Sequence, residues 1–70
     1  MIYKELELLP SYTPYYVIDQ LKIYLDEPNK EKNGWYLFQG VIGMVNLSRT
    51  DRLITGFQSL KLKRILKKLK

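Results

Sequence analysis

Basic side chains are concentrated in the last third of the chain. Eight of the twelve Lys and Arg residues lie in Ser48–Lys70, where Asp51 is the single acid, so this stretch carries a formal charge of +7. Residues 1–47 contain four Lys against six acids and sum to −2. Ammonium and guanidinium groups bind phosphates and other anions, so charge divided in this way favours nucleic acid or an anionic surface as the partner.

The residues that usually carry catalysis or bind metals are absent or unfavourably spaced. The chain contains no His and no Cys, which removes the common proton carrier at neutral pH and the thiolate metal ligand. The close carboxylate pairs, Glu5/Glu7 and Asp26/Glu27, are alternate or adjacent residues that do not face each other on a helix. The sequence therefore predicts a protein that is not an enzyme and that holds no cofactor or metal.

The apolar residues of the basic stretch form two clusters that cannot both face one core from a straight helix. The first cluster contains Leu53, Ile54, Phe57 and Leu60. The second contains Leu62, Ile65, Leu66 and Leu69, roughly 140° further round the helix axis. We therefore expect a helix from Arg49 to about Ser59, a break near 59–61, and a basic C-terminal helix over 61–70. The basic side chains opposite the second cluster are those of Lys61, Lys63, Arg64, Lys67 and Lys68.

A helix start is indicated at the beginning of the basic stretch. In Ser48-Arg49-Thr50-Asp51 the serine hydroxyl can accept from the third helical N–H while the acid reaches back, which is a capping box. A turn at 46–48 would then join two helices, and over 39–56 this layout is similar to the helix-turn-helix of DNA-binding proteins. The resemblance implies that Arg49, Thr50 and Arg52 approach phosphates and base edges. A plain helical hairpin with solvated charges is the alternative.

The elements before this stretch are also mainly helical in pattern. Thr13-Pro14 is a helix start, and apolar residues at helical spacing continue from there to Asp26 or Glu27. The run over 35–47 favours a helix capped by Asn33, although its aromatic and β-branched residues also suit a strand or hairpin over 35–45. Residues 1–9 fit a short strand or a helix. We expect a single all-α domain over 1–70 with three or four helices, and α+β is the alternative.

Aromatic residues lie at the starts of the first two expected helices. Tyr12, Tyr15 and Tyr16 surround the start of one, and Trp35 lies at the start of the other. Tyrosines of this kind usually pack a small core while their hydroxyls stay in contact with water, so we expect packing for all four residues. Stacking of the tyrosines on unpaired bases is the alternative.

Together these patterns predict a small DNA-binding protein, with DNA favoured over RNA. The basic residues of 61–70 would contact phosphates while Arg49, Thr50 and Arg52 face the groove. The alternative is an adaptor or inhibitor of a larger protein, or a homo-oligomer, that uses the apolar cluster of Leu62, Ile65, Leu66 and Leu69. Glu5 and Glu7 interrupt the apolar core that a signal peptide needs, and no span is long and apolar enough for a bilayer, so the expected location is the cytoplasm.

Overall fold

The structure is a computed structural model that describes residues 3–69, and every regular element within that range is helical. A short 3-10 turn, η1 (Lys4–Leu8), precedes α1 (Tyr15–Asp26), α2 (Lys30–Thr50) and α3 (Gly56–Leu69). The all-α prediction is confirmed, and the strand alternative for 35–45 is wrong because those residues lie inside α2. The described part of the ambiguous segment 1–9 forms η1 and not a strand, whereas Met1, Ile2 and Lys70 lie outside the described residues.

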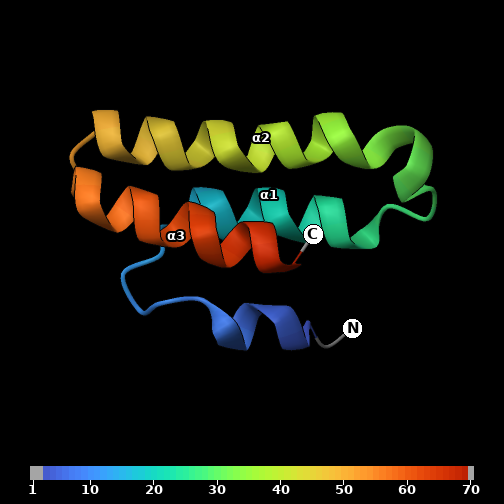
Figure 1. The fold of residues 1–70 in the computed structure, drawn as a ribbon, viewed down its shortest axis with the longest axis horizontal. Helices are drawn as coiled ribbons and strands as arrows, with labels where there is room; N and C mark the ends of the chain where they lie inside the picture. The colour runs from blue at the N-terminus through green and yellow to red at the C-terminus, as the bar shows by residue number, and fades with distance from the viewer. Residues whose placement is uncertain (1–2, 70) are drawn as a thin grey trace.

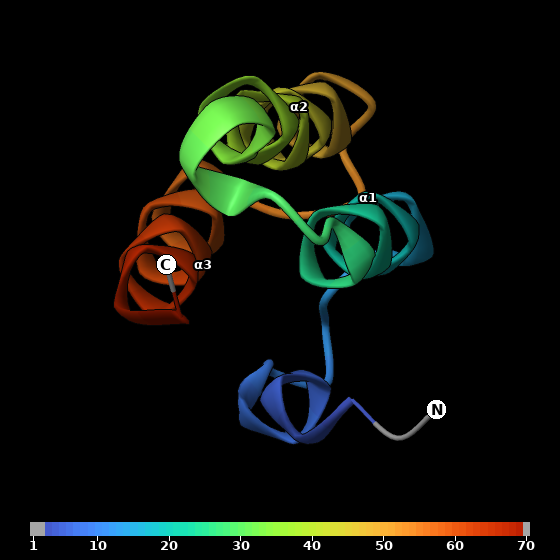
Figure 2. The same cartoon turned by 90° about the vertical axis from the view of Figure 1, so that its right-hand side faces the viewer.

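The three helices lie side by side around one core. Along the chain, α1, α2 and α3 alternate in direction, so that α2 runs antiparallel to both of its neighbours (Figure 1). Seen end-on, the three helices occupy the corners of a triangle, and η1 lies beyond α1 and α3 on the side away from α2 (Figure 2). Each helix therefore has one face toward its neighbours and one face toward the outside.

The core is formed by apolar residues at helical spacing on these inward faces, together with Ile54 of the α2–α3 loop. The buried set comprises Val17, Leu21, Tyr24, Phe38, Val41, Val45, Ile54, Leu62 and Leu66. The rings of Tyr24 and Phe38 meet edge-on with their centroids 5.5 Å apart, which joins α1 to α2. Leu6 and Leu9 pack against the same core from the N-terminal segment. Burial of these residues is the main stabilising term for such a small domain.

The start of α1 differs by one residue from the prediction. The N-cap residue is Pro14, because the Thr13 hydroxyl is directed backwards and donates to the Pro10 carbonyl at 2.7 Å. The last residue of α1, Asp26, lies where the sequence placed it. The helix was therefore correctly located, but its cap was assigned to the wrong residue.

The N-cap of α2 lies four residues before the predicted one. Asn29, not Asn33, caps the helix: its side-chain oxygen accepts from the Lys32 N–H at 3.1 Å. The carboxylate of Glu27 accepts from the Asn29 N–H at 3.0 Å and from the Asn33 amide at 3.1 Å. These bonds, with the nearby charge of Lys30, lower the pKa of Glu27. Asn33 thus supports the α1–α2 loop from within the first turn of α2.

The turn predicted at 46–48 is wrong, because α2 continues through it to Thr50. Ser48 lies on the same inward stripe as Val41 and Val45 and is fully buried. Its hydroxyl donates to the Met44 carbonyl at 2.7 Å, so it cannot act as an N-cap. The packing of this stripe keeps the residues helical for one more turn.

The chain reverses direction between α2 and α3 over residues 51–55. The Leu53 N–H bonds the Ser48 carbonyl at 2.9 Å and the Arg52 N–H bonds the Arg49 carbonyl at 3.0 Å, which together form a Schellman motif. Arg52 occupies the left-handed position of this motif, with φ 62°, where glycine is the usual residue. The end of α2 is therefore fixed by backbone hydrogen bonds at a residue that carries a positive charge.

A reciprocal capping box begins α3. The Thr55 hydroxyl accepts from the Gln58 N–H at 3.0 Å, and the Gln58 side chain accepts from the Thr55 N–H at 2.9 Å. Gly56 is the first residue of the helix and does not weaken its interior. The pattern Thr-x-x-Gln, visible in the sequence, was the signal for this start.

The break predicted near 59–61 is also wrong, because α3 is one continuous helix. Ser59 is buried on the inward face, and its hydroxyl donates to the Gly56 carbonyl at 2.8 Å. An unbroken helix keeps its backbone hydrogen bonds, so the conflict between the two apolar clusters is resolved by exposure of one of them. The side chains of Phe57 and Leu60 are the ones left outside.

Candidate nucleic-acid interface

Helix α3 has an apolar inward face and a mainly basic outward face. Leu62 and Leu66 are fully buried against α1 and α2. Exposed basic residues of the outward face are Lys61, Arg64, Lys67 and Lys68. Lys63, the remaining predicted basic residue of this helix, is half-buried at the side of the helix. The structure therefore brings four of the five predicted cations of α3 to one surface, which we call the basic face.

The cations of the basic face have no acidic partner among residues 3–69. Helix α3 contains no Asp or Glu, and no ion pair or side-chain hydrogen bond involves these Lys and Arg residues in the described part of the chain. Lys67 and Lys68 lie in the last turn, where positive charge also stabilises the helix dipole. Lys61 and Arg64 lie outside that turn and gain little from the dipole. Their charges are free to bind an external anion.

The other predicted site residues lie at the opposite end of α3. Thr50 donates its hydroxyl to the Asn46 carbonyl at 3.1 Å, so its donor is already used within α2. The Arg49 guanidinium lies over Gly56, with Nε 3.2 Å from the position that a β-carbon would take there. Arg52 is exposed in the α2–α3 loop and lines a shallow cleft with Arg49. Arg52 is therefore the residue of this group best placed to reach a phosphate.

The helix-turn-helix arrangement is not present over residues 39–56. Its expected turn lies inside α2, and α2 and α3 pair as an antiparallel hairpin, whereas the motif requires two helices that cross steeply (Figure 1). Arg49 and Thr50 are in the last turn of the first helix of this hairpin and not in the first turn of the second. The hairpin was the alternative that the sequence left open.

A tyrosine-lined hollow of about 590 Å³ adjoins the arginine cleft. Tyr12, Tyr15 and Tyr16 line it with Pro14 and Leu53, and Leu53 also lines the cleft of Arg49 and Arg52. Tyr12 packs against the core as predicted, although its hydroxyl is buried without a hydrogen-bond partner among residues 3–69 and is not in contact with water. Tyr15 and Tyr16 are exposed, so the packing prediction is wrong for those two residues. Sequence reasoning missed Leu53 as a neighbour of the tyrosines, since only the tertiary fold brings the two segments together.

The second apolar cluster of α3 belongs to the core and not to a free surface. Leu62 and Leu66 are fully buried, Leu69 packs against the core, and Ile65 is half-buried. The exposed apolar residues are instead Phe57, which is 79% exposed, and Leu60, which is 61% exposed. The docking surface considered as the alternative for the second cluster is therefore wrong, and of the first cluster only Ile54 is buried.

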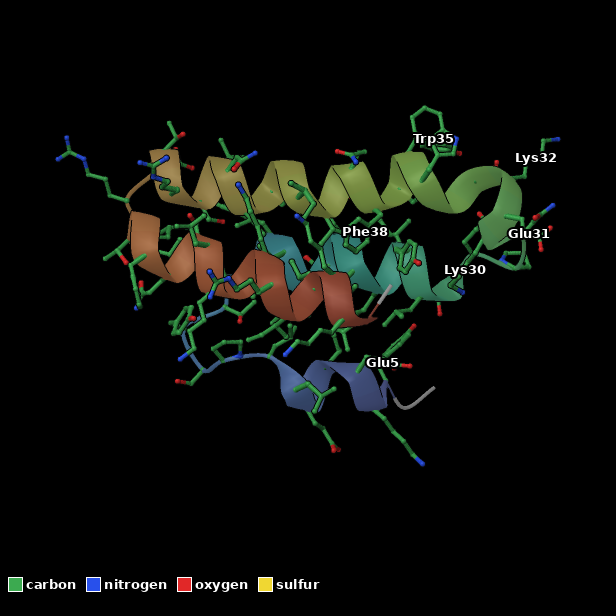
Figure 3. All side chains as sticks on the ribbon, in the orientation of Figure 1. Glu5, Lys30, Glu31, Lys32, Trp35 and Phe38 are labelled. Atoms are coloured by element: carbon green, nitrogen blue, oxygen red, sulfur yellow. The ribbon has the colours of Figure 1, made fainter. Side chains whose placement is uncertain are left out.

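Trp35 is not a core anchor, which corrects another expectation. Its side chain is 66% exposed and projects from α2 away from the other helices, while Phe38 points between them (Figure 3). The Tyr36 ring meets the Trp35 ring edge-on with centroids 5.8 Å apart and is also exposed. A second exposed surface thus lies on α2, and it is aromatic and uncharged where the basic face is cationic.

Comparison of the chain with protein-family models, with curated proteins and with solved structures gives no match. Among residues 3–69, no helix is both long enough and apolar enough to span a membrane. In the same range, no group of three or more acidic side chains is arranged to hold a metal ion. A function for this chain has to be inferred from the chemistry of its own surfaces.

Proposed function

We propose that this protein is a non-enzymatic DNA-binding protein that contacts the phosphate backbone through the basic face of α3. The observation that carries the proposal is the set of exposed cations on one side of a helix without acids, none of them paired with a carboxylate in the described chain. Unpaired charges of one sign attract a polyanion without first having to break internal salt bridges. The expected cytoplasmic location is part of the same proposal.

Binding of this kind requires no reading of bases. Lys61, Arg64 and Lys68 follow one another at helical spacing along one line of the surface. Such side chains bond phosphate oxygens, and these contacts position a protein on DNA without carrying sequence information. Arg52 extends the positive surface beyond the N-terminus of α3, whereas the Thr50 hydroxyl is used within α2 and the exposed Arg49 guanidinium lies over Gly56. We therefore expect affinity for DNA of mixed sequence.

The test is the salt dependence of binding to a labelled DNA duplex, measured by fluorescence anisotropy. With four or five phosphate contacts, the association constant of the unmodified protein should fall by about two to three orders of magnitude between about 50 and 200 mM salt. The variant Arg64→Gln/Lys68→Gln removes two cations from the basic face and should lower the slope of the logarithmic salt plot by about 2.

The matched control removes the same number of charges elsewhere. Lys4 and Lys32 are exposed, one in η1 and one in the first turn of α2. The double variant Lys4→Gln/Lys32→Gln should therefore leave the slope within experimental error of the unmodified protein. Equal slopes for the two double variants, or no binding at low salt, would contradict the proposal.

A second candidate function is favoured by the exposed apolar residues beside the basic face. Phe57, Leu60, Lys61 and Arg64 together line a hollow of about 280 Å³ on α3. Apolar side chains with a basic rim suit a groove-binding helix of an adaptor or inhibitor protein. The variant Phe57→Ser/Leu60→Ser distinguishes the two functions, because it should leave the DNA salt slope unchanged. If the unmodified protein fails to bind DNA, this apolar pair becomes the surface to test against protein partners.

A further inference from the structure

Between residues 35 and 50 the outward face of α2 is exposed and uncharged for about four turns, with the exposed cations Lys32 and Arg49 at its border. Its exposed residues are Trp35, Tyr36, Gln39, Gly43, Asn46, Leu47 and Thr50. On an ideal helix Trp35, Gln39, Gly43 and Asn46 fall within about 80° of one another, so they form one stripe. We call these seven residues the neutral face. The chain as a whole carries a net charge of +5, so a surface of this size without charge requires an explanation.

Two observations show that the neutral face is not needed for the fold of the monomer. Trp35 points away from the other helices (Figure 3) and remains 66% exposed. At Gly43, a β-carbon would have no atom within 4 Å, so the surface there is open. On the surface of a soluble protein, contiguous exposed apolar and aromatic side chains commonly mark an interaction site.

We propose that two copies of this chain associate through the neutral face, with their α2 helices antiparallel about a two-fold axis near Val41. Around that position, the sizes of the side chains on one copy of the face complement those on the second, antiparallel copy. Trp35 then lies beside the partner's Asn46, Tyr36 lies beside the partner's Leu47, and Gln39 lies beside the partner's Gly43. Large side chains meet smaller ones at each step, as an interface between identical surfaces requires. This self-complementarity is what favours a second copy over an unrelated protein.

The distribution of charge also favours a second copy of this chain, aligned antiparallel around Val41. Any strongly basic surface would repel its own copy, and the neutral face avoids this repulsion. At the ends of the contact, Lys32 would lie opposite the partner's Thr50 and one residue from the partner's Asp51, while the exposed Glu31 lies level with the same Asp51, so each end holds one Lys between two acids. Lys32 and Asp51 are both exposed in the monomer and form no ion pair within the described chain.

The expected dimer is weak. One helix face of 16 residues is about 24 Å long, and interfaces that bury less than about 1,200 Å² in total belong to weak or transient complexes. Tryptophan is enriched among the residues that dominate binding energy, so most of the affinity should come from the two copies of Trp35. A dissociation constant in the micromolar range is the expected result.

The single tryptophan makes the proposal directly measurable without nucleic acid. We would record Trp35 emission and sedimentation equilibrium from about 2 to 500 µM protein, a range chosen for a weak interface. The emission maximum should move to shorter wavelength, and the mass should rise from monomer to dimer, over the same concentrations. Because no DNA is present, this experiment can fail or succeed independently of the proposed function.

Matched variants identify the surface. Gly43→Lys places a charge opposite the partner's Gln39 and should raise the dissociation constant at least about tenfold, while the open space at Gly43 leaves the monomer folded by circular dichroism. Ile23→Lys adds the same charge to the exposed side of α1 and should leave association unchanged. Lys32→Asp should weaken the dimer, and adding Asp51→Lys to it should restore association.

Three results would overturn the proposal. The unmodified protein could remain monomeric across the whole concentration range. The Gly43→Lys variant could associate as strongly as the unmodified protein, which would exclude α2 from the contact. Ile23→Lys could abolish association, which would place the interface on α1.

Discussion

The outward faces of α2 and α3 differ sharply, although their inward faces are alike. Each inward face buries apolar residues and one serine whose hydroxyl bonds a carbonyl of its own helix: Ser48 in α2 and Ser59 in α3. Outside, α2 presents the seven uncharged residues of the neutral face, whereas α3 presents the basic face. The requirements of one core made the inward faces similar, and no such requirement acts on the outward faces.

The contrast shows where function should be sought in this fold. A helix that only had to cover the core could carry a few separate charges on its outward side, as α1 does with Asp19 and Asp26. Neither α2 nor α3 follows that pattern within residues 35–69. One surface is suited to a polyanion and the other to a neutral protein surface, and each can be altered without disturbing the core.

The largest expected effect separates the two sides of α3. Leu66→Ala removes a fully buried side chain and should lower the free energy of unfolding by about 2–5 kcal/mol. A domain of this size has only about 3–5 kcal/mol in total, so the variant should be largely unfolded. Leu60→Ala on the exposed side should change the free energy by less than about 0.5 kcal/mol. Urea denaturation followed by circular dichroism measures both, and similar losses would mean that α3 packs through another face.

The next effect concerns the junction between the two helices. Thr55→Ala removes the hydroxyl that caps α3 and should cost about 1 kcal/mol. Ser48→Ala should change stability by less than about 0.5 kcal/mol, because alanine favours the helix and the Met44 carbonyl keeps its helical partner. Thermal denaturation of the two variants shows whether Thr55 or Ser48 is the N-cap of the last helix. A larger loss of stability for Ser48→Ala than for Thr55→Ala would support the turn that the sequence predicted at 46–48.

A smaller effect compares the two sides of α2. Gly43→Ala should raise the free energy of unfolding by up to about 1 kcal/mol, because nothing surrounds the added methyl group and alanine is the better helix former. At the buried Gly34, a β-carbon would lie 3.2 Å from Lys30 Cβ and 3.4 Å from a ring carbon of Tyr24, so Gly34→Ala should gain less or lose stability. Denaturation at low protein concentration, where association is absent, tests the pair. Equal gains would mean that position 34 is as open as position 43.

Among the smallest effects is an acid dependence at the α1–α2 loop. Hydrogen bonds from Asn29 and Asn33 lower the pKa of Glu27 in the folded protein. A lowered pKa gives stability that is present above the ordinary Glu value of about 4.3 and is lost as the pH falls through the folded value. Glu27→Gln should therefore flatten the acid limb of a plot of stability against pH. An unchanged acid limb would show that these bonds do not hold the ionised group.

A similar effect is expected at alkaline pH beside η1. The Tyr3 hydroxyl donates to both carboxylate oxygens of Asp26, at 2.8 and 2.9 Å, and this bond raises the pKa of Tyr3. A raised pKa gives stability that is complete below the ordinary tyrosine value of about 10 and is lost as the pH rises through the folded value. Tyr3→Phe should lower stability slightly at neutral pH and reduce its decline above pH about 10. An unchanged decline would show that the bond is not formed in solution.

Local patterns were sufficient to predict the helical class, the end of the first helix and the cations of the last one. Apolar spacing that repeats with the helical period requires only neighbouring residues, and α1 ends at Asp26 as that spacing indicates. The segregation of charge is likewise visible in the sequence alone. The four exposed cations of the basic face, Lys61, Arg64, Lys67 and Lys68, were therefore among the predicted residues.

The position of the last turn was decided by packing. The sequence offers two starts, Ser48 with Asp51 and Thr55 with Gln58, and both satisfy the local rule for a capping box. Ser48 continues the buried stripe of Val41 and Val45, so its burial keeps α2 helical and leaves Thr55 as the cap. Local rules compare neighbours in the chain and do not include this burial.

Which apolar residues face inward was also decided only by the assembled helices. Leu62 with Leu66 and Phe57 with Leu60 are equally apolar pairs, and Trp35 is as suited to a core as Phe38. Three helices around one core have room for one side of each, and an unbroken α3 can turn only one cluster toward it. The residues left outside became the surfaces of α2 and α3, because exposure of a side chain depends on contacts between distant segments and not on its own chemistry.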